Sequence, residues 1–73
     1  MTKNISDHGR NVAAEEMASL LNHGYRSYGS IKLKDYEAYF LRHTTNGNKA
    51  RVSLTSSQCR VIINKKCVQI TDL

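Results

Sequence analysis

Apolar and polar side chains alternate with a period of two along residues 38–71, and this alternation restricts the fold more than any other feature of the chain. Its first interruption contains Asn46-Gly47, the strongest short signal for a two-residue β-hairpin turn, because both turn positions need positive φ. A turn at this dipeptide places Leu41 opposite Val52. These matched apolar partners predict an antiparallel hairpin.

Two further reversals extend the hairpin into a meander. A turn at Ser56-Ser57 places Leu54 opposite Cys59, and a third turn near residues 64–66 returns the last apolar positions to the same side. The three turns together predict four antiparallel strands. Their expected ranges are 38–44, 49–55, 58–64 and 66–71.

The period of two sorts the side chains of this meander onto two faces. A slip of one residue would turn the apolar set into solvent, so the register is expected to be well specified. The expected inner face is apolar and comprises Tyr39, Leu41, Ala50, Val52, Leu54, Cys59, Val61, Ile63, Val68 and Ile70. The expected outer face comprises Phe40, Arg42, Thr44, Lys49, Arg51, Ser53, Gln58, Arg60, Ile62, Asn64, Cys67, Gln69 and Thr71.

Residues 11–23 have the 3.6-residue period of an amphipathic helix. Asn11 suits the N-cap position, and Gly24 can adopt the left-handed conformation that ends the last turn. The apolar stripe of this helix consists of Ala13, Met17, Leu20 and Leu21.

The segments on either side of this helix are less regular. A helix that starts at Ser6 would contain Gly9, at a cost of up to about 1 kcal/mol relative to alanine. Residues 1–10 are therefore expected to be a flexible N-terminal segment. Weak apolar–lysine alternation after the helix predicts a short edge strand near residues 28–33.

A chain of 73 residues forms one domain, because it is too short to build two hydrophobic cores. The helix has an apolar stripe and the sheet has an apolar face, and each can bury the other. The sequence therefore predicts an α+β fold, with one N-terminal helix packed on a four- to five-stranded antiparallel β-meander. This single domain is expected to span residues 11–73.

The formal net charge is +5, and the excess lies in the second half of the chain. Residues 1–37 carry equal numbers of basic and acidic side chains, whereas residues 38–73 carry six basic side chains and a single acidic one, Asp72. Four of these cations share the predicted outer face, where Arg42 is expected directly opposite Arg51 and no acidic side chain is expected. Such an asymmetry favours a polyanionic partner.

The outer face leads to the principal functional hypothesis, a small non-catalytic module that binds nucleic acid. Cationic side chains would contact phosphate oxygens, and an aromatic ring would stack on a base or wedge between bases. The candidate binding residues are Arg42, Arg51, Arg60, Lys49 and Phe40 on the sheet, with Lys65 and Lys66 at the last turn.

Three other interpretations of the same face are open. The cations are consistent with a solvated surface, on which their long stems cover apolar neighbours. Phe40 and Ile62 could instead lie under residues 1–10 or 25–35 in a second, minor core. Arginine and aromatic side chains are also favoured at protein interfaces. The competing function is therefore a small regulator or inhibitor, of the phage or mobile-element type, that binds an acidic surface of a larger protein.

The predicted edge strand offers a further route to a partner. Lys32 and Lys34 would protect this edge against pairing, or the edge could pair with a second copy to form a homodimer. Tyr25, Tyr28 and Tyr36 cluster around it and are expected to pack the helix end against the sheet, with a binding rim as the alternative.

Neither catalysis nor metal binding is indicated. His8, His23 and His43 have no second ligand at metal spacing, and there is no glycine-rich phosphate loop, so we expect no enzyme activity, metal or cofactor. Cys59 and Cys67 are expected on opposite faces as free thiols. No apolar run approaches the roughly 20 residues of a membrane span, and no signal peptide is visible, so a cytoplasmic location is expected.

Overall fold

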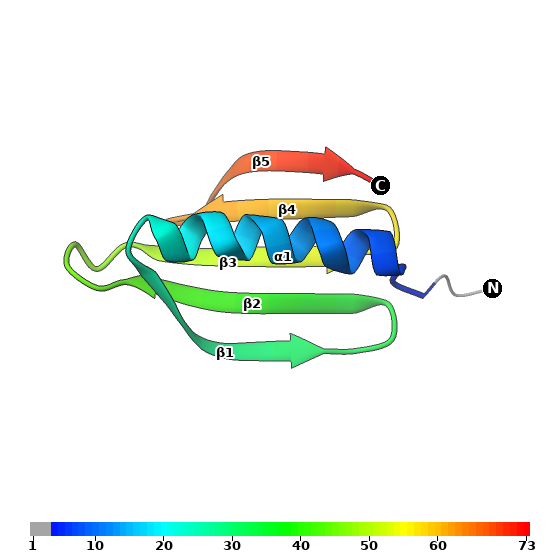
Figure 1. Ribbon diagram of the computed structural model, residues 1–73, viewed down its shortest axis with the longest axis horizontal. Coiled ribbons are helices and arrows are strands. Elements are labelled where there is room, and N and C mark those ends of the chain that lie inside the picture. The colour runs from blue at the N-terminus through cyan, green and yellow to red at the C-terminus, as the bar shows by residue number, and fades with distance from the viewer. Residues whose placement is uncertain (1–3) are drawn as a thin grey trace.

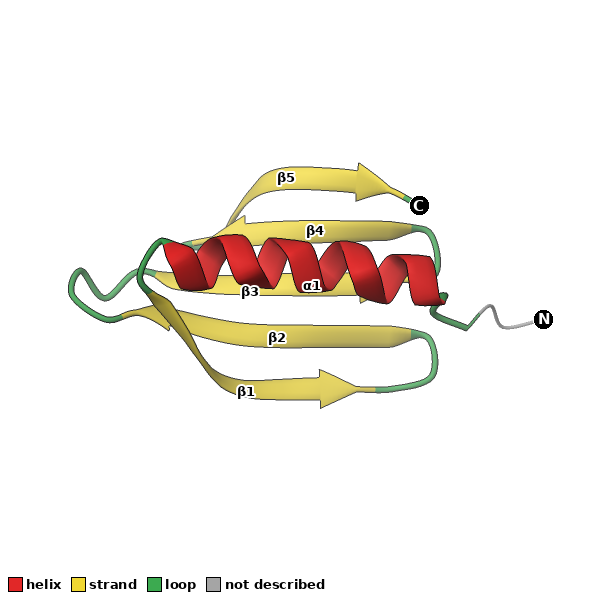
Figure 2. Cartoon of the chain, viewed as in Figure 1, coloured by secondary structure: helices red, strands yellow, loops and turns green. Residues whose placement is uncertain are grey.

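One helix and five strands form two layers in the computed structural model, which describes residues 4–73 (Figure 1). The elements are α1 (Asp7–Asn22), β1 (Tyr25–Lys32), β2 (Tyr36–His43), β3 (Lys49–Thr55), β4 (Gln58–Ile63) and β5 (Lys66–Asp72). The strands pair antiparallel in chain order within one open sheet, and α1 runs along one face of it, over β3 and β4 (Figure 2). The predicted α+β fold is confirmed. No helix in the described part of the chain is long and apolar enough to cross a membrane.

The helix begins four residues before the predicted start. Ser6 is the N-cap, and its Oγ accepts a hydrogen bond from the backbone N–H of Gly9 at 3.0 Å. Gly9 is tolerated inside the helix because a Cβ there would lie 3.1 Å from Leu73 Cδ1 and 3.3 Å from Leu54 Cδ1. Close packing against the sheet thus outweighs the low helix propensity of glycine. Of the segment expected to be flexible, residues 7–10 are helical and residues 1–3 lie outside the described part.

The core lies between α1 and the sheet. Leu41, Val52 and Leu54 are fully buried at its centre, beneath Ala13 and Leu20 of the helix. The eight predicted inner-face residues up to Ile63 all belong to this core or pack against it. The prediction of which side chains of β2, β3 and β4 face the core is therefore confirmed.

The β2–β3 hairpin has the predicted faces but a register shifted by two residues. Leu41 pairs with Ala50, and Tyr39 pairs with Val52. The loop is longer than two residues because His43 Nδ1 accepts hydrogen bonds from two loop amides, at 3.2 Å and 3.3 Å, and so stabilises a wider turn. An even shift leaves every side chain on its predicted face.

The β3–β4 register is as predicted, whereas β5 departs from its expected faces. Ile62 pairs with Cys67 but Val61 pairs with Gln69, so Val68 is an unpaired bulge residue. The bulge reverses the parity of the rest of the strand. Val68 and Ile70 were expected in the core and are instead 58% and 53% exposed.

The edge strand β1 is longer than predicted and also contains a bulge. Ser27 pairs with Leu41 and Gly29 with Phe40, which leaves Tyr28 as the extra residue. The strand starts directly after Gly24, whose φ of +93° fits the predicted helix stop.

Candidate functional site

The sheet face that α1 leaves uncovered is called the outer face, and it is turned away from the viewer in Figure 1. Strand pairing arranges its side chains in rows that run across the strands. The first row is Arg26, Arg42 and Lys49; the second is Gly29, Phe40, Arg51, Ile62 and Cys67; the third is Ile31, Ala38, Ser53, Arg60 and Ile70. The structure therefore brings Arg42, Lys49, Arg51, Arg60 and Phe40 together on one face, as predicted.

The first row places three cations directly opposite one another. Arg42 pairs with Arg26 on one side and with Lys49 on the other. This corrects the expected Arg42–Arg51 pair, because the register is shifted by two residues. Arg26 Nη1 donates to the carbonyl oxygens of Tyr25 at 2.8 Å and Leu21 at 3.2 Å, so its guanidinium turns toward the helix end. Like charges at directly opposite cross-strand positions are mildly destabilising.

Aromatic rings lie beside these cations. Tyr28 and Phe40 have ring centroids 6.3 Å apart, and the Arg42 guanidinium carbon lies 5.3 Å from the Tyr28 centroid. Tyr28 is 60% exposed. A shallow depression of about 350 Å³ is lined by Tyr28, Phe40, Lys49, Ala50, Arg51, Ile62, Lys65 and Cys67.

Tyr28 is a site residue that sequence reasoning did not assign to this face. Regular alternation in β1 does not predict its position, because the bulge at Tyr28 interrupts the alternation. The alternative in which residues 1–10 or 25–35 cover Phe40 and Ile62 is not realised by the elements that the structure describes. Residues 25–32 form strand β1 of the sheet itself, and residues 7–10 belong to α1 on the opposite face. Tyr25 packs on the helix side as expected, edge-on to His43 at 5.0 Å.

The third row contains a fixed arginine. Arg60 Nε and Nη2 both donate to Gln58 Oε1, at 3.1 Å and 2.9 Å, and Gln58 Nε2 donates to Asp72 Oδ1 at 3.2 Å. The β5 bulge places Asp72 opposite Gln58, so the outer face does hold one acidic side chain, contrary to expectation. It also turns Gln69 toward the helix side, where Gln69 Nε2 donates to Glu16 Oε1 at 2.8 Å.

The two lysines of the last turn, Lys65 and Lys66, lie on opposite faces of the sheet. Lys65 has a positive φ and lines the depression on the outer face. Lys66 pairs with Ile63, whose side chain packs against the core, so Lys66 belongs to the helix side. Lys65 thus joins the candidate site, whereas Lys66 does not. The cysteines follow the prediction, with Cys59 buried and Cys67 exposed on the other face.

The ion pairs of the described residues lie on the helix side. Among residues 4–73, Arg10 Nε lies 3.3 Å from Glu37 Oε2 and Arg10 Nη1 lies 3.7 Å from Asp7 Oδ1, and these are the salt bridges formed. The outer-face cations in this part of the chain therefore have no ionic partner. Their charges are available to a ligand.

The buried carboxylate of Glu37 organises a second polar cluster, beneath the helix. Tyr39 donates its hydroxyl to Glu37 Oε1 at 2.7 Å. Burial, reinforced by this hydrogen bond, raises the pKa of Tyr39 to about 12. Burial also raises the pKa of the Cys59 thiol. The Tyr39 hydroxyl and the Cys59 thiol therefore both stay protonated near neutral pH, and neither is a reactive anion.

No protein-family model, no curated protein and no solved structure matches this chain.

Proposed function

We propose that this protein binds single-stranded nucleic acid through the outer face of its sheet. The observation that carries the proposal is a set of four exposed cations, without ionic partners among residues 4–73, beside the exposed and half-buried rings of Tyr28 and Phe40. The four cations are Arg42, Lys49, Arg51 and Arg60.

Charge segregation between the two layers supports a polyanionic ligand. The acidic residues Asp7, Glu15 and Glu16 belong to α1, and Glu37 faces the helix from β2. The outer face is thus positive, apart from Asp72 at the edge. The helix side is close to neutral, because it carries the cations Arg10, Lys32 and Lys66 beside its four acidic residues. A phosphate backbone is therefore attracted to the outer face more strongly than to the helix side.

The dimensions of the sheet favour a single strand over a duplex. Four inter-strand spacings of about 4.8 Å make the face roughly 19 Å wide, whereas the major groove of B-DNA is about 12 Å wide and admits a helix or a two-stranded ribbon. A single strand can lie across the open face with its bases splayed out. Stacking of a base on Phe40 or Tyr28 is worth about 1–3 kcal/mol.

Fluorescence anisotropy with a labelled mixed-sequence oligonucleotide of twelve or so nucleotides tests the proposal. Four phosphate contacts predict a slope of about −2.8 for the logarithm of the association constant against the logarithm of salt concentration. The same strand in duplex form should bind more weakly. An affinity independent of salt contradicts the proposal, and preferential binding of the duplex contradicts the choice of a single strand.

The double variant Arg42→Glu plus Arg51→Glu provides the matching perturbation. Both side chains are exposed on strands whose core residues remain intact, so the variant should keep the far-ultraviolet circular dichroism of the wild type. Oligonucleotide binding should be lost, because two contacts become repulsive. An unfolded variant would show that these side chains support the fold.

A second candidate function, binding of a larger protein, is favoured by the apolar side chains at the sheet edges. Ile31 on β1 and Ile70 on β5 are 43% and 53% exposed on the outer face, and each strand has one unpaired edge. A regulator or inhibitor could add such an edge to a partner sheet. Capture of a specific protein from nuclease-treated lysate, together with failure to bind oligonucleotide, would favour this function.

A further inference from the structure

The hydroxyl of Ser53 is a buried polar group that the fold does not satisfy. Ser53 is 8% exposed, and its Oγ has no hydrogen-bond partner among the described residues. A buried hydroxyl without a partner costs about 1–3 kcal/mol. Its cross-strand neighbour on β2 is Ala38, which shows that a small side chain without a hydroxyl is accommodated in this part of the row. Among residues 4–73, no hydrogen bond offsets this cost of the serine.

Ser53 lines a depression between two arginines, and its Oγ is covered in this structure. Arg51 precedes Ser53 by two residues on the same face of β3, and Arg60 is its direct partner on β4. The depression has a volume of about 470 Å³ and is lined by Tyr36, Arg51, Ser53, Thr55, Ser57, Gln58, Arg60 and Ile62. The lining is polar and contains two positive charges and no acidic residue.

Hydrogen bonds already hold Arg60 in place. Two of its N–H groups donate to Gln58 Oε1, and Asp72 in turn orients the Gln58 amide. A guanidinium has five N–H donors, so three remain for a ligand. Thr55, by contrast, is committed to the β3–β4 turn, where its Oγ1 accepts from the backbone N–H groups of Ser57 and Gln58. Among the residues of this lining, Ser53, Arg51 and Tyr36 have side-chain donors without a partner, and Arg60 has its three remaining donors.

We propose that this depression binds one phosphate group of the nucleic-acid strand. Rotation about the Cα–Cβ bond of Ser53 brings its hydroxyl into the depression, where it donates to one non-bridging oxygen. The guanidinium groups of Arg51 and Arg60 hold the charge from either side. This subsite rests on the proposed function and deepens it, because it gives the strand a fixed point in the row next to the aromatic rings. Arg51 lies in the second row, opposite Phe40, and also lines the depression, so it links the phosphate subsite to Phe40.

Ser53→Ala tests the subsite, because it removes only the hydroxyl. The variant should bind the oligonucleotide about tenfold more weakly, which is the loss expected for one hydrogen bond to a charged group. Its thermal midpoint should be equal to or above that of the wild type, because an unsatisfied buried hydroxyl is gone. Ser30→Ala is the matched control, since Ser30 is exposed on β1 and pairs with Tyr39 on the helix side. It should leave affinity unchanged.

An NMR titration of the whole chain with inorganic phosphate separates the subsite from the function. Phosphate should shift the residue-53 amide and the Arg60 Nε–H signal in the wild type, and Ser53→Ala should need about tenfold more phosphate for the same shifts. If the oligonucleotide binds both proteins equally and phosphate leaves Ser53 unmoved, the subsite is overturned while the nucleic-acid function stands. If phosphate shifts Ser53 but the oligonucleotide does not bind, the subsite is supported and the nucleic-acid function is refuted.

Discussion

Arg42 and Lys49 carry like charges at directly opposite positions of β2 and β3. Removal of both charges should weaken oligonucleotide binding and leave the free energy of unfolding almost unchanged. The two side chains are directly opposite on β2 and β3 and exposed, so their repulsion opposes folding by a few tenths of a kcal/mol up to about 1 kcal/mol. Substitution of both by glutamine relieves this repulsion. It also removes the contact of the Arg42 guanidinium with Tyr28, which contributes about 0.5–1 kcal/mol at an exposed site.

These two effects have opposite signs and similar sizes. The free energy of unfolding of Arg42→Gln plus Lys49→Gln should therefore stay within about 0.5 kcal/mol of the wild type, a change of at most roughly 4 °C in the thermal midpoint of so small a domain. Binding should change far more. Loss of two phosphate contacts out of four changes the slope of log association constant against log salt concentration from about −2.8 to about −1.4. The ratio of the wild-type affinity to the variant affinity should therefore fall by about 25-fold when the salt concentration rises tenfold.

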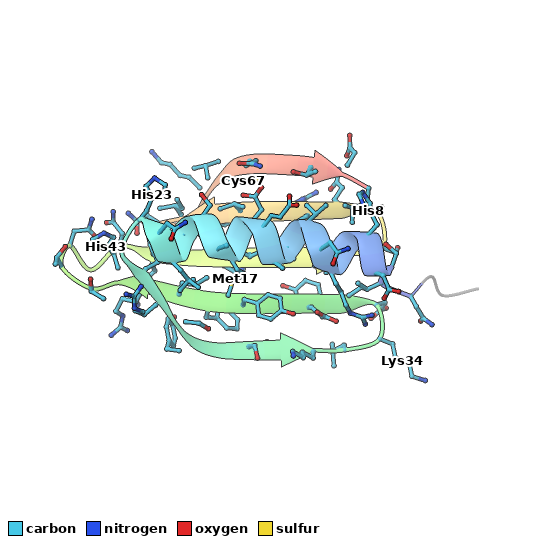
Figure 3. All side chains as sticks on the ribbon, viewed as in Figure 1. His8, Met17, His23, Lys34, His43 and Cys67 are labelled. Carbon is cyan, nitrogen blue, oxygen red and sulfur yellow. The ribbon has the colours of Figure 1, made fainter. Side chains whose placement is uncertain are left out.

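The assay combines urea denaturation with anisotropy titrations across a tenfold range of sodium chloride. The control is Lys34→Gln plus Lys66→Gln, which removes the same net charge elsewhere. Lys34 lies at the end of the sheet away from His43, as Figure 3 shows, and Lys66 faces the helix side. The control should keep a slope near −2.8. Equal loss of slope in both double variants would refute the reasoning, because binding would then depend on overall charge and not on the outer face.

Three further predictions concern the fold. Gly24→Ala should destabilise the protein more than Gly47→Ala, because both glycines have positive φ but only a Cβ at Gly24 would meet a neighbouring imidazole nitrogen, at 2.8 Å; the difference between their urea midpoints measures the clash. The raised pKa of Tyr39 means that its neutral form is stabilised in the folded state, so its contribution to stability is complete below about pH 10 and is lost as the pH rises toward 12; Tyr39→Phe should remove this part of the pH dependence in denaturation experiments. A thiol reagent should modify Cys67 rapidly in the native protein and Cys59 only after unfolding, and fast reaction of both would contradict the buried position of Cys59.

Local pattern accounts for most of the sheet. In β3 and β4, Val52 pairs with Val61 as predicted, because both strands are regular and the turn between them is short. In the β2–β3 hairpin the predicted turn position was wrong, since the loop conformation depends on hydrogen bonds to the ring of His43. The predicted faces of β2 and β3 were nevertheless correct, because a register shift of an even number of residues leaves each side chain on the same face.

The start of α1 and the bulges in β1 and β5 could not be predicted from the local sequence pattern, because each depends on tertiary packing. Gly9 is read as a helix breaker from propensity alone, yet it permits the close approach of α1 to Leu54 and Leu73. Tyr28 and Val68 are bulge residues, each without a partner on the neighbouring strand. The position of an extra residue depends on how the whole strand packs and twists, and no short stretch of sequence encodes that.

Some features of the candidate site could likewise be predicted from strand periodicity, and others depend on the tertiary structure. Side-chain parity was enough to place Arg42, Lys49, Arg51 and Arg60 on one surface, because strand periodicity is a local property of the backbone. The ring beside Arg42, the Asp72–Gln58–Arg60 relay and the solitary hydroxyl of Ser53 needed the folded molecule. Each of them comes from a bulge, or from neighbours on adjacent strands that exclude water, and such relations between distant segments exist only once the chain has packed.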